Sequence, residues 1–250
     1  MKKTPKQPDL TILIPAYREE KRIGKTLDEL SLFIQKDKIL SHINVEVMVV
    51  SADSPDKTHE IVQQKAKLFS NFVFVKSGAK VGKGRDVRAG MLRAKGQAVL
   101  FMDADLATPL KYIPKFYKTY LEGTDVVAAT RNLRRHHPGI LRRMLSNFGN
   151  LLFRILCGVW IEDSQCGFKL FSKKAQKVCF SKMTIQGWGF DMEVLTIARV
   201  NKFKMATFRI NDWKSVAGGT FVDNPIKSAF VSLSELLYIF WRRANGKYKI

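Results

Sequence analysis

Cysteine is scarce in this chain. Its 250 residues include Cys157, Cys166 and Cys179, an odd number without C-x-x-C spacing. A disulfide framework needs paired cysteines, and a structural zinc site needs closely spaced ligands. We therefore expect neither, and this cysteine usage fits a reducing, cytosolic setting.

Long apolar runs are also lacking. No stretch reaches the roughly 18 apolar residues that cross a bilayer. Residues 1–8 are basic and polar, without the apolar core of a secretory signal. The nearest candidate, residues 228–241, is short and contains Glu235. We expect no signal peptide and no transmembrane helix.

Acidic residues are few relative to basic ones. The sequence has 43 Lys and Arg against 22 Asp and Glu, a formal charge of +21. This imbalance indicates polyanionic surroundings, which are nucleic acid, anionic lipid or phosphorylated substrates. No nucleic-acid-binding motif is present, and the aromatic residues are not interleaved with basic ones as a stacking platform requires. We expect no nucleic-acid partner.

The order of apolar runs predicts an α/β fold. Runs typical of buried strands occupy residues 10–14, 45–50, 72–75, 98–102 and 125–130. Helical patterns separate them, at residues 17–34, up to residue 69, and from residue 85 to about 94. Strands that alternate with helices favour a mostly parallel sheet flanked by helices. Because no repeat or linker interrupts the pattern, we expect one domain.

The most informative motif is Asp103-Ala104-Asp105, directly after the apolar run 98–102. An α/β sheet binds ligands at the carboxyl ends of its strands. Carboxylates there suit Mg²⁺ or Mn²⁺ holding a diphosphate. An isolated D-x-D is more often a solvated turn. Two further loops, 15–20 and 51–56, also follow predicted strands, so all three are expected to face one ligand.

These residues resemble a known family. The matching segments are Ile14-Pro15-Ala16-Tyr17-Arg18-Glu19-Glu20, Ser54-Pro55-Asp56-Lys57-Thr58, Gly82-Lys83-Gly84 and Met102-Asp103-Ala104-Asp105-Leu106-Ala107-Thr108-Pro109. In this order they are similar to the inverting GT-A (Rossmann-like) glycosyltransferases of family 2. The similarity is strongest to the polyprenyl-phosphate group, which includes dolichyl-phosphate β-glucosyltransferases and mannose synthases. Segments 163–171 and 187–193 extend it, so it covers roughly residues 10–215.

The resemblance implies metal-dependent, inverting transfer of a hexose from a nucleotide sugar to a polyprenyl or dolichyl phosphate. Asp103 and Asp105 match the acids that hold Mg²⁺ or Mn²⁺. The positions that match donor-binding residues are Pro15, Ala16, Tyr17, Glu19, Asp53, Lys83, Gly84, Asp103, Ala104 and Asp105. By itself, the segment Gly82 to Arg85 is a weak phosphate signal, because an exposed basic turn has the same composition.

The acceptor phosphate is already largely ionised at neutral pH. It needs positive charge to place it, rather than a general base. Arg131, with Arg142 or Arg143, corresponds to the acceptor-phosphate arginines of the family. Asp191 matches a motif acid and joins Asp103, Asp105 and Arg131 as a catalytic candidate.

Three further motif positions are assigned to the sugar pocket or its loop, Gln165, Trp188 and Glu193. Asp191 and Glu193 would be general bases for a hydroxyl acceptor, or would organise the site through hydrogen bonds. Gln165 and Trp188 shape the pocket or simply pack. The sequence leaves these alternatives open.

Two departures from the family pattern concern the donor. Ser51 and Ala52 replace two consecutive acids, one of which commonly contacts the nucleoside. Asp53 is shifted by one residue, which turns a strand side chain to the other face. The nucleobase is therefore left open. The segment Leu106 to Pro109 is more similar to the glucosyltransferase branch, which favours UDP-glucose or a related UDP-sugar over GDP-mannose.

The C-terminal segment has a broad apolar stripe from residue 225 to 241, followed by basic residues. This pattern is typical of an interfacial helix on an anionic membrane surface. A core helix, or a dimer helix in a homo-oligomer, is the alternative. We expect a peripheral protein on the cytoplasmic face of a membrane. The predicted division is a basic tail at 1–9, a GT-A domain at 10–222, and the amphipathic helix with its basic tail at 223–250.

Two other functions remain open at this point. The same fold could transfer sugar to a hydroxyl of a glycan or protein, which would require Asp191 or Glu193 as a base. Alternatively, the chain could be a non-catalytic basic module that binds anions or a membrane, with Ser51 and Ala52 marking a decayed donor site.

Overall fold

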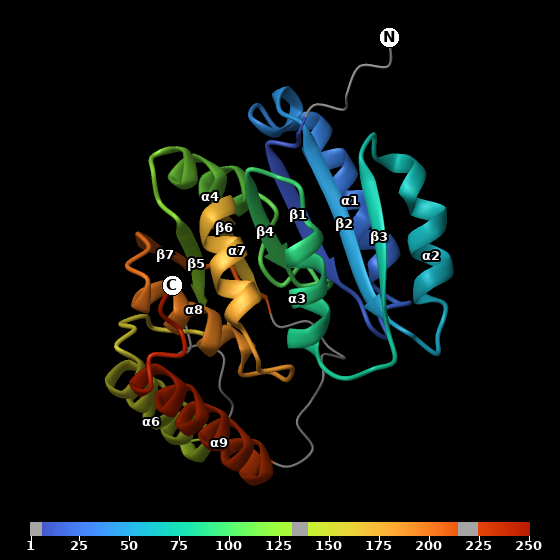
Figure 1. The fold of residues 1–250 in the computed structure, drawn as a ribbon. Coiled ribbons are helices and arrows are strands. Elements are labelled where there is room, and N and C mark those ends of the chain that lie inside the picture. The colour runs from blue at the N-terminus through green and yellow to red at the C-terminus, as the bar shows by residue number, and fades with distance from the viewer. Residues whose placement is uncertain (1–6, 132–139, 215–224) are drawn as a thin grey trace.

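The computed structural model describes residues 7–131, 140–214 and 225–250. In the helix at 140–157 it describes side chains from residue 148 onward, and in the helix at 225–244 from residue 230 onward. These residues form a seven-stranded sheet of order β3-β2-β1-β4-β6-β5-β7 (Figure 1). The strands are β1 (Leu10–Pro15), β2 (Val45–Ala52), β3 (Phe72–Gly78), β4 (Ala98–Met102), β5 (Val126–Arg131), β6 (Phe168–Ser172) and β7 (Met205–Ile210). Strand β6 runs antiparallel to β4 and β5, while the neighbouring pairs without it are parallel.

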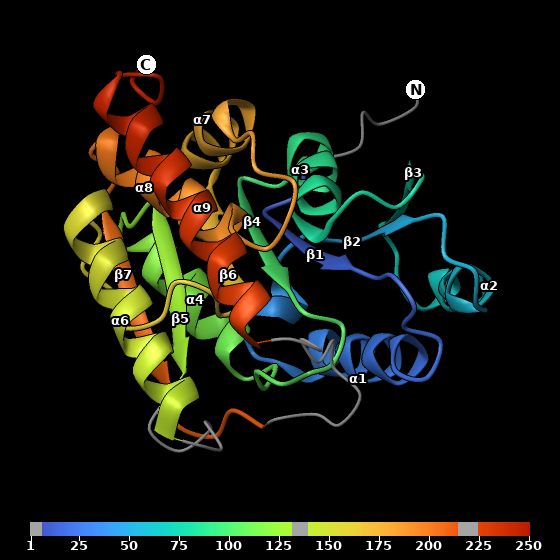
Figure 2. The same ribbon diagram turned by 90° about the horizontal axis from the view of Figure 1, so that it is seen from below.

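Helices cover both faces of the sheet (Figures 1 and 2). One apolar core joins it to α1 (Ile23–Lys36), α2 (Thr58–Lys65) and α4 (Tyr112–Leu121). The other joins it to α3 (Lys83–Arg93), α6 (Ile140–Cys157), α7 (Lys173–Lys182), α8 (Phe190–Val200) and α9 (Pro225–Ala244). Strands covered on both faces are apolar along their whole length. This explains why β1, β2 and β4 are recognisable as mainly apolar runs in the sequence.

The α/β fold and the mostly parallel sheet predicted from the sequence are confirmed. The predicted start of the first helix at residue 17 is wrong, because α1 begins at Ile23. Residues 16–22 instead form a loop in which Arg18 has a positive φ of 57°. The three cysteines are buried free thiols.

The end of the chain folds back onto the body of the protein. Helix α9 packs against α6 and α8, and its Leu236 and Ile239 are buried. Beyond the helix, the Tyr248 side chain is fully buried. Within the described residues, no helix combines the length and the apolar character that a membrane span requires.

Candidate active site

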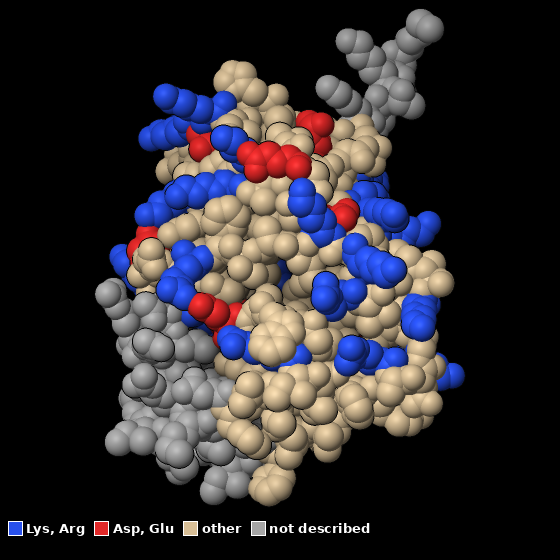
Figure 3. All heavy atoms as spheres, turned by 90° about the vertical axis from the view of Figure 1, so that its left-hand side faces the viewer, with Lys and Arg blue, Asp and Glu red and all other residues tan. Residues whose placement is uncertain are grey.

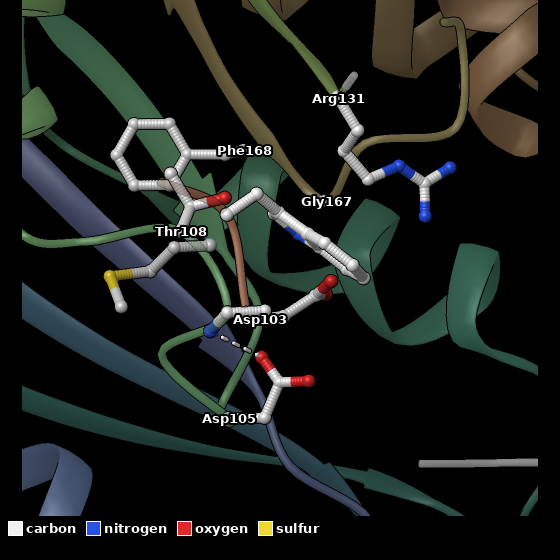
Figure 4. A pocket seen from close by; sticks show the side chains of 9 residues that line it. Asp103, Asp105, Thr108, Arg131, Gly167 and Phe168 are labelled. Atoms are coloured by element: carbon white, nitrogen blue, oxygen red, sulfur yellow. Dashed lines mark hydrogen bonds between the residues drawn. The ribbon is translucent and has the colours of Figure 1, made fainter. Parts of the chain in front are cut away.

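A cavity of about 150 Å³ opens where β4, β5 and β7 end and β6 begins. Figure 4 shows the Asp103 and Asp105 side chains on one part of its wall and Arg131 on another. The lining residues are Met102, Asp103, Asp105, Ala107, Thr108, Arg131, Gly167, Phe168 and Trp213. The structure therefore brings together three of the predicted catalytic residues.

Asp103 is fixed by the start of β6. Its backbone N–H donates to the Gly167 carbonyl oxygen at 3.0 Å, and its carboxylate accepts a hydrogen bond from Lys83 Nζ. A Cβ atom on Gly167 would overlap the Asp103 carboxylate. Glycine at 167 is thus required for Asp103 to lie against this backbone.

Asp105 stands in a tight turn. The following residue, Leu106, has a φ of 55°, and the Ala107 N–H donates to Asp105 Oδ1 at 3.0 Å. Thr26 of α1 donates to the Ala104 carbonyl oxygen at 2.6 Å, which anchors the turn. A left-handed conformation at a non-glycine residue is costly and is concentrated at functional sites. Burial, followed by repulsion from Asp103, raises the pKa of Asp105.

A third carboxylate, Glu19, lies within electrostatic range of this pair. Burial raises its pKa, although Arg22 binds it through Nε at 2.6 Å and Nη2 at 3.0 Å. Asp103 and Asp105 raise the pKa of Glu19 further. A bound cation relieves the repulsion between clustered carboxylates.

The donor set suits Mg²⁺ or Mn²⁺ held together with a diphosphate. Two carboxylates, Asp103 and Asp105, line the cavity and could hold such an ion. Such ions are commonly bound through one or two carboxylates and substrate phosphates. Asp103 and Asp105 fit that arrangement.

Arg131 forms a forked ion pair with Asp163. Its Nε donates to Oδ2 at 2.6 Å and its Nη2 to Oδ1 at 3.0 Å. Burial lowers the pKa of Arg131, but the Asp163 carboxylate outweighs burial and raises it. The guanidinium carbon lies 5.5 Å from the Trp213 ring centroid. Since a guanidinium has five N–H donors, this pairing leaves donors of Arg131 for an anion in the cavity.

Asp191 lies outside the cavity lining, in a buried ion pair. Lys169 Nζ donates to Asp191 Oδ1 at 2.5 Å and to the Cys166 carbonyl oxygen at 2.6 Å. The pKa of Asp191 is raised, because the effect of burial outweighs the opposing effect of Lys169 and Lys83. This pair stabilises the floor of the site, and the Asp191 side chain is almost inaccessible.

Glu193 has its oxygens occupied by protein donors. It accepts hydrogen bonds from Thr184 N at 2.9 Å, Thr184 Oγ1 at 2.8 Å, Ile185 N at 2.7 Å and Tyr248 OH at 2.8 Å. The carboxylate therefore joins the loop between α7 and α8 to the C-terminal segment. Nothing in this geometry directs it toward a substrate.

The basic segment at the start of α3 packs closely on that loop. A Cβ on Gly84 would come within 2.8 Å of the Ile185 and Gly187 carbonyl oxygens, and Gly82 is similarly confined by Gln186. These glycines thus allow two backbones to approach. Lys83 reaches past them to Asp103, with its Nζ 5.2 Å from the Trp188 ring centroid.

The loop after β1 is held by side chains that follow β2. Arg18 N donates to Ser54 Oγ at 3.0 Å, and Glu19 N donates to Thr58 Oγ1 at 2.9 Å. Asp56 accepts from the Glu20 N–H at 3.3 Å. The Ser-x-Asp-x-Thr motif therefore positions backbone here.

The other donor-side candidates surround this loop. Pro15 ends β1, and buried Ala16 donates its N–H to Val50 O at 2.8 Å. Tyr17 has Lys80 Nζ 4.6 Å from its ring centroid. Asp53 is exposed just beyond the end of β2.

Some predicted residues lie elsewhere. Gln165 is exposed outside the cavity lining, and its N–H donates to Asp163 Oδ1 at 3.1 Å. Arg142 and Arg143 are in the first turn of α6, and their side chains fall outside the described residues. Ser51 and Ala52 are buried, and Ser51 Oγ lies 2.9 Å from His59 Nε2.

Two contributors were not predicted from the sequence. Trp213 lines the cavity, and Asp163 holds Arg131. Trp213 follows β7, a strand that the sequence patterns did not reveal, so its position at a strand's carboxyl end was hidden. Asp163 opens a motif segment, but its partner is 32 residues away and only the fold brings the two together.

Comparisons with known proteins agree with this architecture. The profile of glycosyl transferase family 2 matches residues 11–180. A dolichyl-phosphate beta-glucosyltransferase of Trichomonas vaginalis is 34% identical over 220 residues, covering 84% of this chain and 67% of that protein. The human dolichyl-phosphate beta-glucosyltransferase is 29% identical over 257 residues, covering 96% of this chain and 78% of that protein. A similar solved structure is that of glucosyl-3-phosphoglycerate synthase of Mycobacterium tuberculosis with Mn²⁺, UDP and glucosyl-3-phosphoglycerate. It has a TM-score of 0.64 at 18% identity and covers 93% of this chain and 80% of that protein.

The mostly parallel sheet flanked by helices, with an acidic pair at the end of a central strand, matches the GT-A fold. The chain belongs to glycosyl transferase family 2. The family resemblance seen in the sequence is thereby confirmed.

Proposed function

We propose that this enzyme transfers glucose from UDP-glucose to dolichyl or a related polyprenyl phosphate, with inversion at the anomeric carbon. The observation that carries the proposal is the shared cavity of Asp103, Asp105 and Arg131. One side of the cavity suits a cation-bound diphosphate, and the other presents a guanidinium to a second phosphate. The dolichyl-phosphate glucosyltransferases among its relatives support the acceptor and the sugar.

On the donor side, Asp103 and Asp105 would hold Mg²⁺ or Mn²⁺ against the diphosphate. Such a cation neutralises the charge that develops on the leaving nucleoside diphosphate. UDP is present with Mn²⁺ or Mg²⁺ in solved structures of glucosyl-3-phosphoglycerate synthase, a protein of the same fold. Lys83, already beside Asp103, would pair with a phosphate oxygen once the cation engages the carboxylate. The loops that carry Tyr17 and Asp53 are the proposed base-binding region.

On the acceptor side, Arg131 would orient the lipid phosphate for in-line attack. Its Asp163 partner fixes the guanidinium plane, and a fixed fork binds phosphate with little loss of side-chain entropy. Arg142 or Arg143 would add positive charge from α6. The positive charge offsets the repulsion between the attacking phosphate and the donor diphosphate.

The buried acids favour a phosphate acceptor over a hydroxyl. A hydroxyl acceptor needs a base within reach of its proton. Asp191 is paired with Lys169 beneath the site, and Glu193 is occupied by four donors. A phosphate acceptor requires no such base, because it is already ionised. We assign Asp191 and Glu193 to the support of the site.

The proposed acceptor places the enzyme at a membrane surface, and we propose the cytoplasmic face. Exposed apolar side chains form one stripe on α6 and another on α9, and these helices pack together. The residues are Phe148, Leu151, Ile155, Phe230, Leu233, Leu237 and Trp241. Figure 3 faces the left-hand side of Figure 1 and shows, among the coloured residues, a lower area with few charged side chains below a region rich in Lys and Arg. Apolar contact beneath a basic zone suits a membrane with anionic lipids.

The test is transfer of radiolabel from UDP-glucose or GDP-mannose into organic-extractable lipid, with dolichyl phosphate and Mn²⁺ or Mg²⁺. We expect cation-dependent labelling from UDP-glucose that is lost in Asp105→Asn. Glu122→Gln, which changes an exposed acid after α4, is the matched control and should retain activity. Labelling from GDP-mannose alone would correct the donor. Nucleotide binding without lipid labelling from either donor would refute the acceptor.

A further inference from the structure

The loop between α7 and α8 reaches the acidic pair through a single lysine. Its Trp188 lies over Lys83, with Nζ 5.2 Å from the ring centroid, and the same Nζ donates to Asp103 Oδ1. Cation–π contact and the ion pair act on one ammonium group. The position of Trp188 therefore bears directly on where Lys83, and with it Asp103, lies.

Helix α9 contacts this loop through Glu235. A Cβ on Gly187 would meet Glu235 Oε1 at 2.9 Å, and a Cβ on Gly189 would meet Oε2 at 2.5 Å. The Gly189 backbone N–H lies close enough to the Glu235 carboxylate to oppose the rise in its pKa that burial causes. The two glycines on either side of Trp188 thus let one acid of α9 lie directly on the loop backbone.

Glu235 is unusual in its surroundings. It is the one acid in the sequence from residue 225 to 244, within an otherwise apolar and basic helix. It is half-buried, and burial raises its pKa. A partly buried carboxylate is unfavourable unless hydrogen bonds compensate for lost hydration. The Gly187 and Gly189 backbone lies against the Glu235 oxygens, and the Gly189 N–H offsets part of the effect of burial on its pKa.

We propose that Glu235 is a positioning residue for the donor-diphosphate site. It holds the backbone from Gly187 to Gly189, which keeps Trp188 over Lys83 and Lys83 beside Asp103. The inference rests on the proposed function, because it assigns Lys83 to the donor diphosphate. Since α9 also carries an exposed apolar stripe, one helix links the proposed membrane face to the donor site.

The test is the affinity for UDP in the presence of Mn²⁺, measured by titration calorimetry. Loss of a polar contact to a charged group typically changes an equilibrium constant by about tenfold or more. We therefore expect Glu235→Ala to weaken UDP binding by about tenfold. Glu235→Gln keeps an oxygen beside the Gly189 N–H and should restore binding to within about twofold. Glu235→Asp keeps the charge but not the reach, and should resemble Glu235→Ala.

Coupling to Trp188 distinguishes positioning from general destabilisation. If Glu235 acts through Trp188, the double variant Glu235→Ala/Trp188→Ala should bind UDP no more weakly than Trp188→Ala alone. Ser234→Ala, at the exposed neighbouring position on α9, is the matched control and should bind normally. Unchanged UDP affinity in Glu235→Ala, or additive losses in the double variant, would overturn the inference. UDP binding with the expected coupling but without lipid product would refute the proposed acceptor and leave the inference intact.

Discussion

Carboxylates around the cavity differ in how far protein donors already occupy their oxygens. Asp163 accepts two side-chain bonds from Arg131 and the N–H groups of Arg131 and Gln165. Burial opposes its charge, but Arg131 outweighs burial and lowers the pKa of Asp163. Asp105 accepts from the Ala107 N–H, and its pKa is raised. The oxygens of Asp163 are thus occupied by protein donors, whereas the Asp105 carboxylate can still bind a ligand.

Asp105 should therefore reduce stability while it supports activity. The raised pKa of Asp105 means that the folded state favours the protonated carboxyl. The protonated carboxyl stabilises the fold fully at pH values below the ordinary pKa of 3.8, and this stabilisation is lost as pH rises through the raised pKa of the folded state. Asp105→Asn mimics the neutral form. We expect a higher melting temperature than the unmodified protein at neutral pH, a smaller difference as pH falls toward 3.8, and loss of transfer activity.

The measurement is thermal unfolding without added divalent cation across this pH range, beside the radiolabel assay. Glu122→Gln removes the same charge from the surface and should leave the melting temperature nearly unchanged. A melting temperature of Asp105→Asn below that of the unmodified protein at neutral pH would show that Asp105 is not under repulsion in the folded state.

Sequence patterns identified elements where burial alone determines the residue types. Strands β1, β2 and β4 have helices on both faces and appear as apolar runs. Strand β6 was not predicted, and its second residue is Lys169, which is fully buried and paired with Asp191. The start of α1 was misplaced because the preceding loop is held by hydrogen bonds that its backbone N–H groups donate to Ser54 and Thr58, more than thirty residues away.

The same distinction applies to the site. Asp103 and Asp105 could be predicted because a strand's end places them, and Arg131 because it matches an acceptor-phosphate arginine of the family. The choice between a catalytic and a structural role for Glu193 could not be made, since its partners come from separate segments of the chain, one of them 55 residues away. Local patterns indicate which residues reach the sheet edge, whereas tertiary contacts decide which of them remain accessible.

The C-terminal segment is expected to stabilise the fold through Tyr248. Its hydroxyl donates to Glu193 Oε1 at 2.8 Å, and its backbone oxygen accepts from Asn201 Nδ2 at 2.8 Å. Tyr248→Phe removes a donor to a buried carboxylate, which should lower the free energy of unfolding by about 1–3 kcal/mol. Urea denaturation measures this change. Lys249→Ala, at the exposed next residue, is the control, and equal stability of the two variants would contradict the proposed link.

At the scale of the whole molecule, charge and apolar surface are unevenly distributed. The net charge of +21 favours approach to an anionic surface, and its effect weakens as salt increases. The apolar stripes of α6 and α9 add a contact that salt does not screen in this way. Long-range attraction and short-range apolar contact together would bring the cavity to a lipid whose phosphate stays at the bilayer surface.

Replacing Leu151 of α6 and Leu237 of α9 by glutamate tests this arrangement. Each substitution removes an apolar side chain that would contribute up to about 1.5–3 kcal/mol on burial, and each adds a charge that anionic lipid repels. We expect cosedimentation with phosphatidylserine-containing vesicles to fall by more than about tenfold in the double variant, while UDP binding with Mn²⁺ is retained. Leu121→Glu, at an exposed apolar position at the end of α4, is the matched control. Normal vesicle binding by the double variant, together with conversion of a dimer to a monomer, would instead assign this face to a homo-oligomer.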